Sequence, residues 1–312
     1  MDKLKLAFYW AASCGGCEIA VLDIDEKILD VVEIADILFW PVALDFKYKD
    51  VKAMPDKHID VCFFNGAIRN NENEHLAKLF RAKSKLMIAF GSCAHQGSVV
   101  GLGNLWNKDT IFERAYFETQ STENPQKTVP ETSVKIKEGV LTLPKFNETV
   151  KTLDQTVDVD YYLHGCPPNP NVIFTAINAI VSGKLPPKGS VLGPQKSVCD
   201  ECSRVRKDRK ISKINRIYEI EVDDETCLWD LGVPCMGPAT RAGCDAQCTD
   251  VNMPCTGCQG PGPNVKEQGS AMISALSSIV VDKTVIDQFV DPIGTFYKYS
   301  LAASILRRRR MK

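Results

Sequence analysis

Twelve of the thirteen cysteines in this 312-residue chain fall into three groups of four. Four thiolates form the ligand set of a tetrahedral zinc ion or of a cubane iron–sulfur cluster. Three such sets in one chain suggest a row of electron-carrying centres. The remaining cysteine, Cys62, lies in the apolar run 61–64 and is predicted to be a buried small hydrophobe. The three groups, in chain order, are Cys14, Cys17, Cys93 and Cys166; Cys199, Cys202, Cys227 and Cys235; and Cys244, Cys248, Cys255 and Cys258.

The bulk composition is that of an ordinary globular protein long enough for two domains. A formal net charge of −1 gives no global attraction to nucleic acid or to a membrane surface. No stretch approaches ~20 uncharged apolar residues, so we expect no transmembrane helix. The first residues indicate a strand and carry no export leader, which predicts a cytoplasmic protein. Disulfides are rare in that compartment, where closely spaced cysteines more often hold metal.

Short apolar runs alternate with helical patterns through residue 183. Such runs are typical of buried parallel strands. Helices are predicted at 72–83 and after Asn169, which is an N-cap followed by Pro170; Gly183 ends the second helix. The apolar spacing over 19–32 is also helical. The alternation predicts an α/β fold, a flavodoxin-like doubly wound parallel sheet with helices on both faces. The runs predicted as strands are 4–10, 37–40, 59–64, 86–90 and 161–163.

The first cysteine group falls just after predicted strands. Open α/β sheets bind their ligands in loops at the carboxyl ends of their strands. The sheet is therefore expected to bring these four cysteines together, although Cys14 and Cys166 are far apart in the sequence. Cys14 and Cys17 follow strand 4–10, Cys93 follows strand 86–90, and Cys166 follows strand 161–163.

A Pro- and Lys-containing linker at 184–189 indicates a domain boundary. We expect a flavodoxin-like domain over 1–187 and a smaller, irregular cysteine-rich domain over 188–312. Eight cysteines lie among many Gly and Pro residues over 199–258, a segment that is not expected to build a large apolar core and should take much of its stability from metal centres. The last 50 residues, with Phe289, Phe296 and Tyr297, are expected to pack back on the body.

Several chemistries fit parts of this pattern. A C-x-x-C pair after a strand, as at Cys14 and Cys17, is also found in thioredoxin-like redox sites, but those need no third or fourth cysteine. The pairs at Cys199–Cys202 and Cys255–Cys258 resemble halves of zinc ribbons, and two structural zinc ions are an alternative for the second domain. Zinc does not explain a third four-cysteine group on the sheet.

The motifs resemble the small, electron-transfer subunit of nickel–iron hydrogenases. The resemblance is strongest to the methanogen type that reduces methyl viologen but not the deazaflavin coenzyme, and that feeds heterodisulfide reductase. It covers nearly the whole chain. The motifs that carry it are Cys14-Gly-Gly-Cys17-Glu18, Gly91-Ser-Cys93-Ala94, Gly165-Cys166-Pro-Pro, Cys227-Leu-Trp-Asp-Leu-Gly-Val-Pro-Cys235-Met-Gly-Pro and Pro254-Cys255-Thr-Gly-Cys258.

The resemblance implies three 4Fe–4S clusters: a proximal one on the first cysteine group, a distal one on the second, and a medial one on the third. It also implies that H2 is split at a nickel–iron centre in a partner large subunit, so that no catalytic residue lies in this chain. Electrons would leave toward an iron–sulfur acceptor subunit that leads to heterodisulfide reductase. The implied protein is an oxidoreductase subunit with no nucleic-acid or membrane partner.

Two ligand positions depart from the pattern of many relatives. Cys199 stands where many have a histidine as the first distal ligand, and the added thiolate charge should lower that cluster's potential. Cys248 stands where periplasmic relatives have a proline and a three-iron medial cluster, which predicts a four-iron medial cluster here. Ferredoxin-style runs of four cysteines, found in hydrogenases that reduce the deazaflavin coenzyme, do not occur in the sequence. The related subunit of respiratory complex I lacks a cysteine-rich second half. Both comparisons argue against assigning this chain to those two groups.

Other polar residues have weaker signals. Glu18 follows a predicted ligand and is a candidate for cluster tuning or proton relay, although a solvated or helix-terminal charge is the simpler interpretation. Asn65 stands where many relatives have Glu. His95 and His164 neighbour predicted ligands and are not expected to bind metal themselves. Basic residues at 204–213 and 307–310 are most simply solvated, and the first set is a candidate guide for an acidic electron acceptor.

Two other functions remain open at this point. The same clusters would serve as a relay in a carbon-monoxide- or formate-linked complex. A zinc-stabilised binding module is the non-enzymatic alternative.

Overall fold

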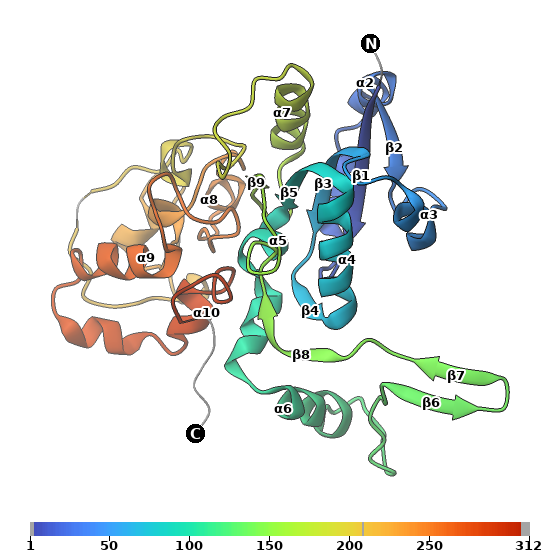
Figure 1. Cartoon of the computed structure of the whole chain (residues 1–312). Helices are drawn as coiled ribbons and strands as arrows, with labels where there is room; N and C mark the ends of the chain where they lie inside the picture. Colours follow the sequence, from blue (N-terminus) through green and yellow to red (C-terminus); the bar gives the residue numbers. More distant parts are fainter. Residues whose placement is uncertain (1–2, 208, 307–312) are drawn as a thin grey trace.

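A computed structural model describes residues 3–207 and 209–306 of the chain. Its centre is a five-stranded sheet in the order β2-β1-β3-β5-β9, in which every neighbouring pair is parallel (Figure 1). All five strands form where the sequence predicts strands, and β2 and β5 each begin two residues early. The strands are β1 (Leu4–Trp10), β2 (Ala35–Phe39), β3 (Ile59–Asn65), β5 (Ser84–Phe90) and β9 (Tyr161–Leu163).

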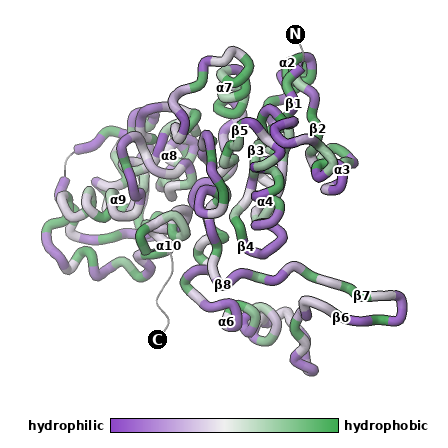
Figure 2. Tube along the Cα trace, viewed as in Figure 1, coloured by the Kyte–Doolittle hydropathy of each residue, from purple (hydrophilic) through white to green (hydrophobic). Residues whose placement is uncertain are grey.

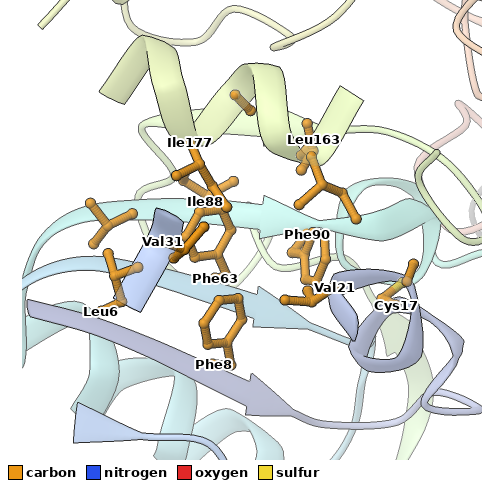
Figure 3. Packing of buried hydrophobic residues seen from close by; sticks show 14 of the residues in the cluster. Leu6, Phe8, Cys17, Val21, Val31, Phe63, Ile88, Phe90, Leu163 and Ile177 are labelled. Atoms are coloured by element: carbon orange, nitrogen blue, oxygen red, sulfur yellow. The ribbon is translucent and has the colours of Figure 1, made fainter. Parts of the chain in front are cut away.

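Alternate residues of the strands bury two separate apolar layers. On one face Phe8 stacks on Phe63 with ring centroids 5.0 Å apart, and Ile177 of α7 covers them (Figure 3). On the other face Tyr9 packs against Phe80 of α4. Cys62 is fully buried in this second layer, as predicted. Both faces of the sheet are thus covered by helices, which confirms the flavodoxin-like α/β class.

The two most clearly signalled helices form as predicted. Helix α4 spans Asn71–Lys83, and α7 spans Pro170–Val181, with the Asn169 side chain accepting a hydrogen bond from the backbone N–H of Asn171 at 2.9 Å. Figure 2 shows the hydrophobic character of α7, whose inner face meets the sheet. Short α3 (Tyr48–Ala53) packs beside α4.

The apolar pattern over 19–32 forms two helices instead of one. Helix α1 (Gly16–Leu22) and α2 (Lys27–Ile34) are separated by a turn in which Asp25 has a φ of 55°. Ile28 of this pattern packs against the core, but the other regularly spaced apolar side chains point outward, and Leu29 is 62 % exposed. The buried contacts come instead from residues between them. The exposed set, named the α1–α2 stripe below, is Ile19, Leu22, Leu29 and Val32.

The segment between β5 and β9 has structure that the sequence patterns did not indicate. After α5 (Gly91–Gln96), the chain forms short helical turns and then an extended arm (Figure 1). The arm returns to the body through β8 (Phe146–Lys151), which pairs antiparallel with β4 (Ile68–Asn70). The other elements of this segment are η1 (Val99–Leu105), α6 (Lys108–Glu113), η2 (Arg114–Glu118), β6 (Ser133–Ile136) and β7 (Gly139–Thr142).

The second half is irregular, as predicted, and it contains a second apolar core. Trp229 is almost fully buried, and its indole N–H donates to the carbonyl of Cys235 at 2.6 Å. Helical residues Met272, Leu276 and Phe296 pack around it. The 199–258 segment thus shares a sizeable core with C-terminal residues and does not build one alone. Its elements are η3 (Val198–Asp200), η4 (Ile217–Glu219), η5 (Leu228–Leu231), η6 (Gly237–Ala239), α8 (Gln247–Asp250), α9 (Gln268–Ser277), η7 (Lys283–Gln288) and α10 (Pro292–Phe296).

The C-terminal residues pack back on the body. Phe289 and Tyr297 join the second core, and Leu102 of the first half packs against it. The carbonyl of Ala302 accepts a hydrogen bond from Gln155 at 2.9 Å. The basic residues at 307–310 lie outside the described part of the chain. Among the described residues, no helix is both long and apolar enough to cross a membrane.

Asp160 joins the sheet domain to the linker after α7. Its carboxylate accepts hydrogen bonds from Arg81 and Lys188, both at 2.6 Å, and from the backbone N–H of Met87 at 2.8 Å. Burial alone raises its pKa, but these hydrogen bonds outweigh burial and hold the pKa of Asp160 below its usual value.

Replacing Asp160 with asparagine is expected to lower the free energy of unfolding at neutral pH by about 3 kcal/mol, because it leaves two cations without their partner. A carboxyl with a lowered folded-state pKa stabilises the fold above its unfolded-state pKa, and that contribution is lost as the pH falls through the folded-state pKa. The difference in the free energy of unfolding between the unmodified protein and Asp160→Asn, measured by denaturant titration, should therefore shrink in acid. Asp45→Asn, at an exposed ion pair with Lys47, is the control and should change little. A difference that stays constant with pH would contradict this role.

Candidate metal centres

The sheet brings the first four cysteines together at the carboxyl ends of β1, β5 and β9. Cys14 follows β1, Cys17 lies in α1, Cys93 in α5, and Cys166 after β9. Burial raises the pKa of the Cys17 thiol, and the neighbouring thiols of Cys93, Cys166 and Cys14 raise it further. The mutual effect shows that the four side chains are neighbours in space.

Glycines make room for these thiols. Gly91 has a φ of +81°, and a Cβ atom there would lie 2.3 Å from Cys17 Sγ. Gly165 has a φ of +123°, and a Cβ atom there would lie 2.4 Å from Cα of Pro168. Only glycine adopts these conformations without strain and leaves the space open. Gly91 thus leaves room for the Cys17 thiol, and Gly165 leaves room for the turn of backbone that follows Cys166.

The second cysteine set gathers around the short turns η3 and η5. Burial raises the pKa of Cys199 to about 12, and the nearby thiols of Cys235, Cys227 and Cys202 contribute. Cys199 is exposed and Cys235 is buried against Trp229. This set therefore reaches from the second apolar core to the surface of the chain.

The third cysteine set lines a cavity of about 300 Å³. The wall also includes Cys166 of the first set. Within residues 3–207 and 209–306, no three His, Cys, Asp or Glu side chains lie close enough together to hold a single metal ion. A cubane brings its own iron and sulfide and takes one thiolate at each iron, so it needs thiols spaced around a cavity. The donor set and the cavity fit such a cluster. The cysteines in this wall are Cys166, Cys244, Cys248, Cys255 and Cys258.

The third set lies between the other two. On one side, the thiols of Cys258 and Cys166 are neighbours in the wall of this cavity. Ser92 Oγ also donates a hydrogen bond to the carbonyl of Cys258 at 2.6 Å. On the other side, Cys255 neighbours Cys235, and the backbone N–H of Met236 donates to the carbonyl of Cys255 at 2.8 Å. The three sets thus form a continuous row, although their order along the chain is different.

Glu18 is fully buried beside Cys17, so its interpretation as a solvated charge is wrong. Its carboxylate accepts hydrogen bonds from Trp40 Nε1 at 2.5 Å and Asn65 Nδ2 at 3.3 Å. Burial raises the pKa of Glu18, and the two hydrogen bonds partly oppose this. It also lies in the first turn of α1, where a negative charge is favourable. Asn65 therefore has a structural partner that sequence reasoning did not foresee.

The two histidines near the first set are buried and neutral. Burial lowers the pKa of His95 and of His164 to about 4. His164 Nε2 lies 3.0 Å from the carbonyl of Ala242, and the His95 ring packs at a tilt against Tyr162 with centroids 4.6 Å apart. The contact of His164 joins the first half of the chain to the second.

Most of the basic residues over 204–213 are engaged within the chain. Arg204 donates hydrogen bonds to the carbonyls of Thr249, Asp223 and Thr226, and Arg206 pairs with Asp230. These side chains hold the second and third cysteine sets in place. The structure therefore gives this segment an internal structural role, which weakens the idea that it guides an acceptor.

Comparisons with known proteins agree with this geometry. A family described as the NADH ubiquinone oxidoreductase 20 Kd subunit matches residues 14–180, which span the first cysteine set alone. The chain is 42% identical over 319 residues to an iron–sulfur subunit of the F420-non-reducing hydrogenase of Archaeoglobus profundus, covering 99% of both chains. It is 35% identical over 322 residues to the corresponding F420-non-reducing hydrogenase subunit of Methanothermobacter thermautotrophicus, covering 100% of this chain and 98% of that protein.

Solved structures show the same fold. A chain of an NAD+-reducing [NiFe]-hydrogenase in the H2-reduced state superposes with a TM-score of 0.51 at 26% identity, covering 59% of this chain and 94% of that chain. A chain of the [NiFeSe] hydrogenase from Desulfovibrio vulgaris Hildenborough gives a TM-score of 0.53 at 15% identity and covers 84% of this chain and 94% of that one. The second similarity extends into the cysteine-rich half.

Proposed function

This chain belongs to the iron–sulfur small subunits of F420-non-reducing hydrogenases, and we propose its role from that membership. It is the small, electron-transfer subunit of a hydrogenase, and it pairs with a large catalytic subunit. The proposal concerns what the twelve cysteines hold and where the electrons go.

In this proposal the chain holds three 4Fe–4S clusters. When bound, such clusters supply one-electron transfer. The first cysteine set holds the proximal cluster, the third set the medial cluster, and the second set the distal cluster. The observation that carries the proposal is the row of thiol sets, in which Cys258 neighbours Cys166 and Cys255 neighbours Cys235. The proposed domains, 1–187 and 188–312, then carry one and two clusters.

We propose that the large subunit covers the α1–α2 stripe. The four apolar side chains of the stripe are exposed in the isolated chain, and half-exposed Trp10 lies beside the Cys14 loop, where its indole N–H donates to the carbonyl of Ser13 at 3.1 Å. Exposed aromatic and aliphatic side chains of this kind are typical of an interface. Burial of this face would place the first cysteine set next to the H2-splitting site of the partner.

The proposed acceptor is an iron–sulfur subunit that leads to heterodisulfide reductase in the cytoplasm. Cys199 and Cys248 add thiolates where many relatives have histidine or proline, and added negative charge favours a low-potential relay. The exposed Cys199 marks the side of the distal set that an acceptor can approach. Glu18 remains a candidate for tuning or proton relay, now as a buried carboxyl held by Trp40 and Asn65.

Anaerobic purification of the tagged full-length chain from its native host tests this function. We expect a nickel-containing large subunit to co-purify with the chain. We also expect H2 alone to reduce the iron–sulfur centres, observed as a decrease in their absorption. Reduction by carbon monoxide or formate, with no nickel-containing hydrogenase partner and no response to H2, would instead support a relay in another oxidoreductase.

A further inference from the structure

Ser98 is a fully buried residue with an unusual backbone, directly after helix α5. Its φ and ψ are 47° and −152°, a combination that a non-glycine residue rarely adopts. Such strain persists only where the surroundings over-determine it, and it concentrates at functional sites. Ser98 was not singled out by the sequence, because nothing in its local pattern distinguishes it.

The surroundings do fix this residue. The preceding Gly97 has a φ of +88°, and its position for a Cβ atom lies 2.5 Å from Cβ of Ala302 in the C-terminal segment. The backbone N–H of Gly101 lies 2.9 Å from the carbonyl of Gly97 and 3.0 Å from the carbonyl of Ser98. The loop is therefore held between η1 and the C-terminal segment.

The Ser98 hydroxyl contacts one cysteine of the first set. Ser98 Oγ donates to Cys166 Sγ at 3.7 Å, a normal length for a hydrogen bond to sulfur. A hydroxyl that donates to this sulfur stabilises negative charge on it, and Ser98 reaches Cys166 from a segment that is distant in the sequence.

We propose that Ser98 is a positioning residue that raises the reduction potential of the proximal centre by hydrogen bonding to the sulfur of Cys166. The inference rests on the proposed function, because it takes this cysteine as a cluster ligand. Hydrogen bonds to the sulfurs of a cluster favour its reduced, more negative state and so raise its potential. The strained backbone is what places the hydroxyl there.

Two substitutions separate the hydroxyl from the strain. Ser98→Ala removes the hydroxyl and keeps a Cβ atom in the strained conformation. Ser98→Gly removes the hydroxyl and also removes the strain, because glycine adopts a positive φ freely. If Ser98 has only a structural role, the two variants should differ from each other in the reduction potential of the proximal centre as well as in stability. The proposed role predicts that they share one potential and differ only in stability.

The test is an EPR-monitored redox titration of the anaerobically purified hydrogenase complex carrying each variant. Relative to the unmodified protein, both variants should shift the oxidised-to-reduced ratio of the proximal centre by up to about tenfold toward oxidised, equal to about 59 mV for a one-electron couple. The medial and distal potentials should stay in place, and the glycine variant should melt at a higher temperature than the alanine variant.

Three results would overturn the inference. Unchanged proximal potentials in both variants would show that the hydroxyl does not act on the centre. A shift in the alanine variant alone would assign the effect to backbone strain. If the unmodified complex retains its iron but shows no signal that depends on Cys166, the ligand assignment fails and this inference fails with it. Complete lack of iron in the unmodified protein would instead refute the proposed function itself.

Discussion

A methyl group added at Gly91 is expected to abolish the proximal centre. Gly91→Ala would place its Cβ atom 2.3 Å from Cys17 Sγ, a distance that no real contact allows, so the buried Cys17 thiol would have to leave its position. We expect the purified complex to lose about four of about twelve irons, the content of one cubane. Reduction of the medial and distal centres by H2 should fall to background, measured by EPR after exposure to H2.

Gly189→Ala is the matched control for this substitution. Gly189 has a φ of +87°, close to the +81° of Gly91, but a Cβ atom there would meet nothing within 4 Å. The control therefore carries the same backbone strain, about 1 kcal/mol, without the clash. It should keep its full iron content and its response to H2. Equal iron loss in both variants would assign the effect of Gly91→Ala to strain and would contradict a close approach of this backbone to Cys17.

Replacing Cys248 with proline is expected to convert the medial centre into a three-iron cluster. Cys248 lines the cavity of the third set, and it lies in the first turn of α8, where proline is tolerated. The change removes one thiolate and leaves Cys244, Cys255 and Cys258. We expect the loss of about one iron per chain, a three-iron EPR signal in the oxidised protein, and a higher medial potential, because negative charge is removed.

Cys62→Ala is the control for the loss of a cysteine. Cys62 is buried between strands, and the proposed row of centres does not include it. Its loss should cost about 1 kcal/mol of stability through the small cavity it leaves and should change neither the iron content nor the spectrum. An unchanged iron count and spectrum in Cys248→Pro would show that Cys248 is not a ligand of the medial centre.

The sheet domain was largely predictable because its strands are buried on both faces and therefore appear as continuous apolar runs. Strand β1 was predicted residue for residue, and Asn169 and Pro170 marked the start of α7 through capping chemistry that depends only on local sequence. The cysteine loops follow from those strands, since parallel strands bring their carboxyl ends to one edge.

Other features depend on contacts between distant segments and left no local pattern. The apolar residues of α1 and α2 have helical spacing, but the stripe faces outward, and a single sequence does not distinguish an outward-facing stripe from a core-facing one. Glu18 is held by Trp40 and Asn65, which are 22 and 47 residues away. The core around Trp229 draws on helices α9 and α10, so the composition of the cysteine-rich segment alone underestimated it.

The second half of the chain has two sources of stability, its apolar core and the centres that its cysteines would hold. Trp229 donates to the carbonyl of Cys235, and Arg204 holds the carbonyl of Thr249 next to Cys248, so apolar core and candidate ligands share residues. Metal centres that bind only the folded arrangement would stabilise it further by mass action. Loss of a centre is therefore expected to loosen this half more than the sheet domain, whose core is independent of the cysteines in the second and third sets.

Iron, sulfide and zinc content of the anaerobically purified protein, with EPR of its oxidised and reduced forms, tests the central claim most directly. Three cubane clusters predict about twelve irons per chain, matching sulfide, and no three-iron signal on mild oxidation. Roughly two zinc ions and little iron would show that the cysteine sets are structural sites and would contradict the electron relay.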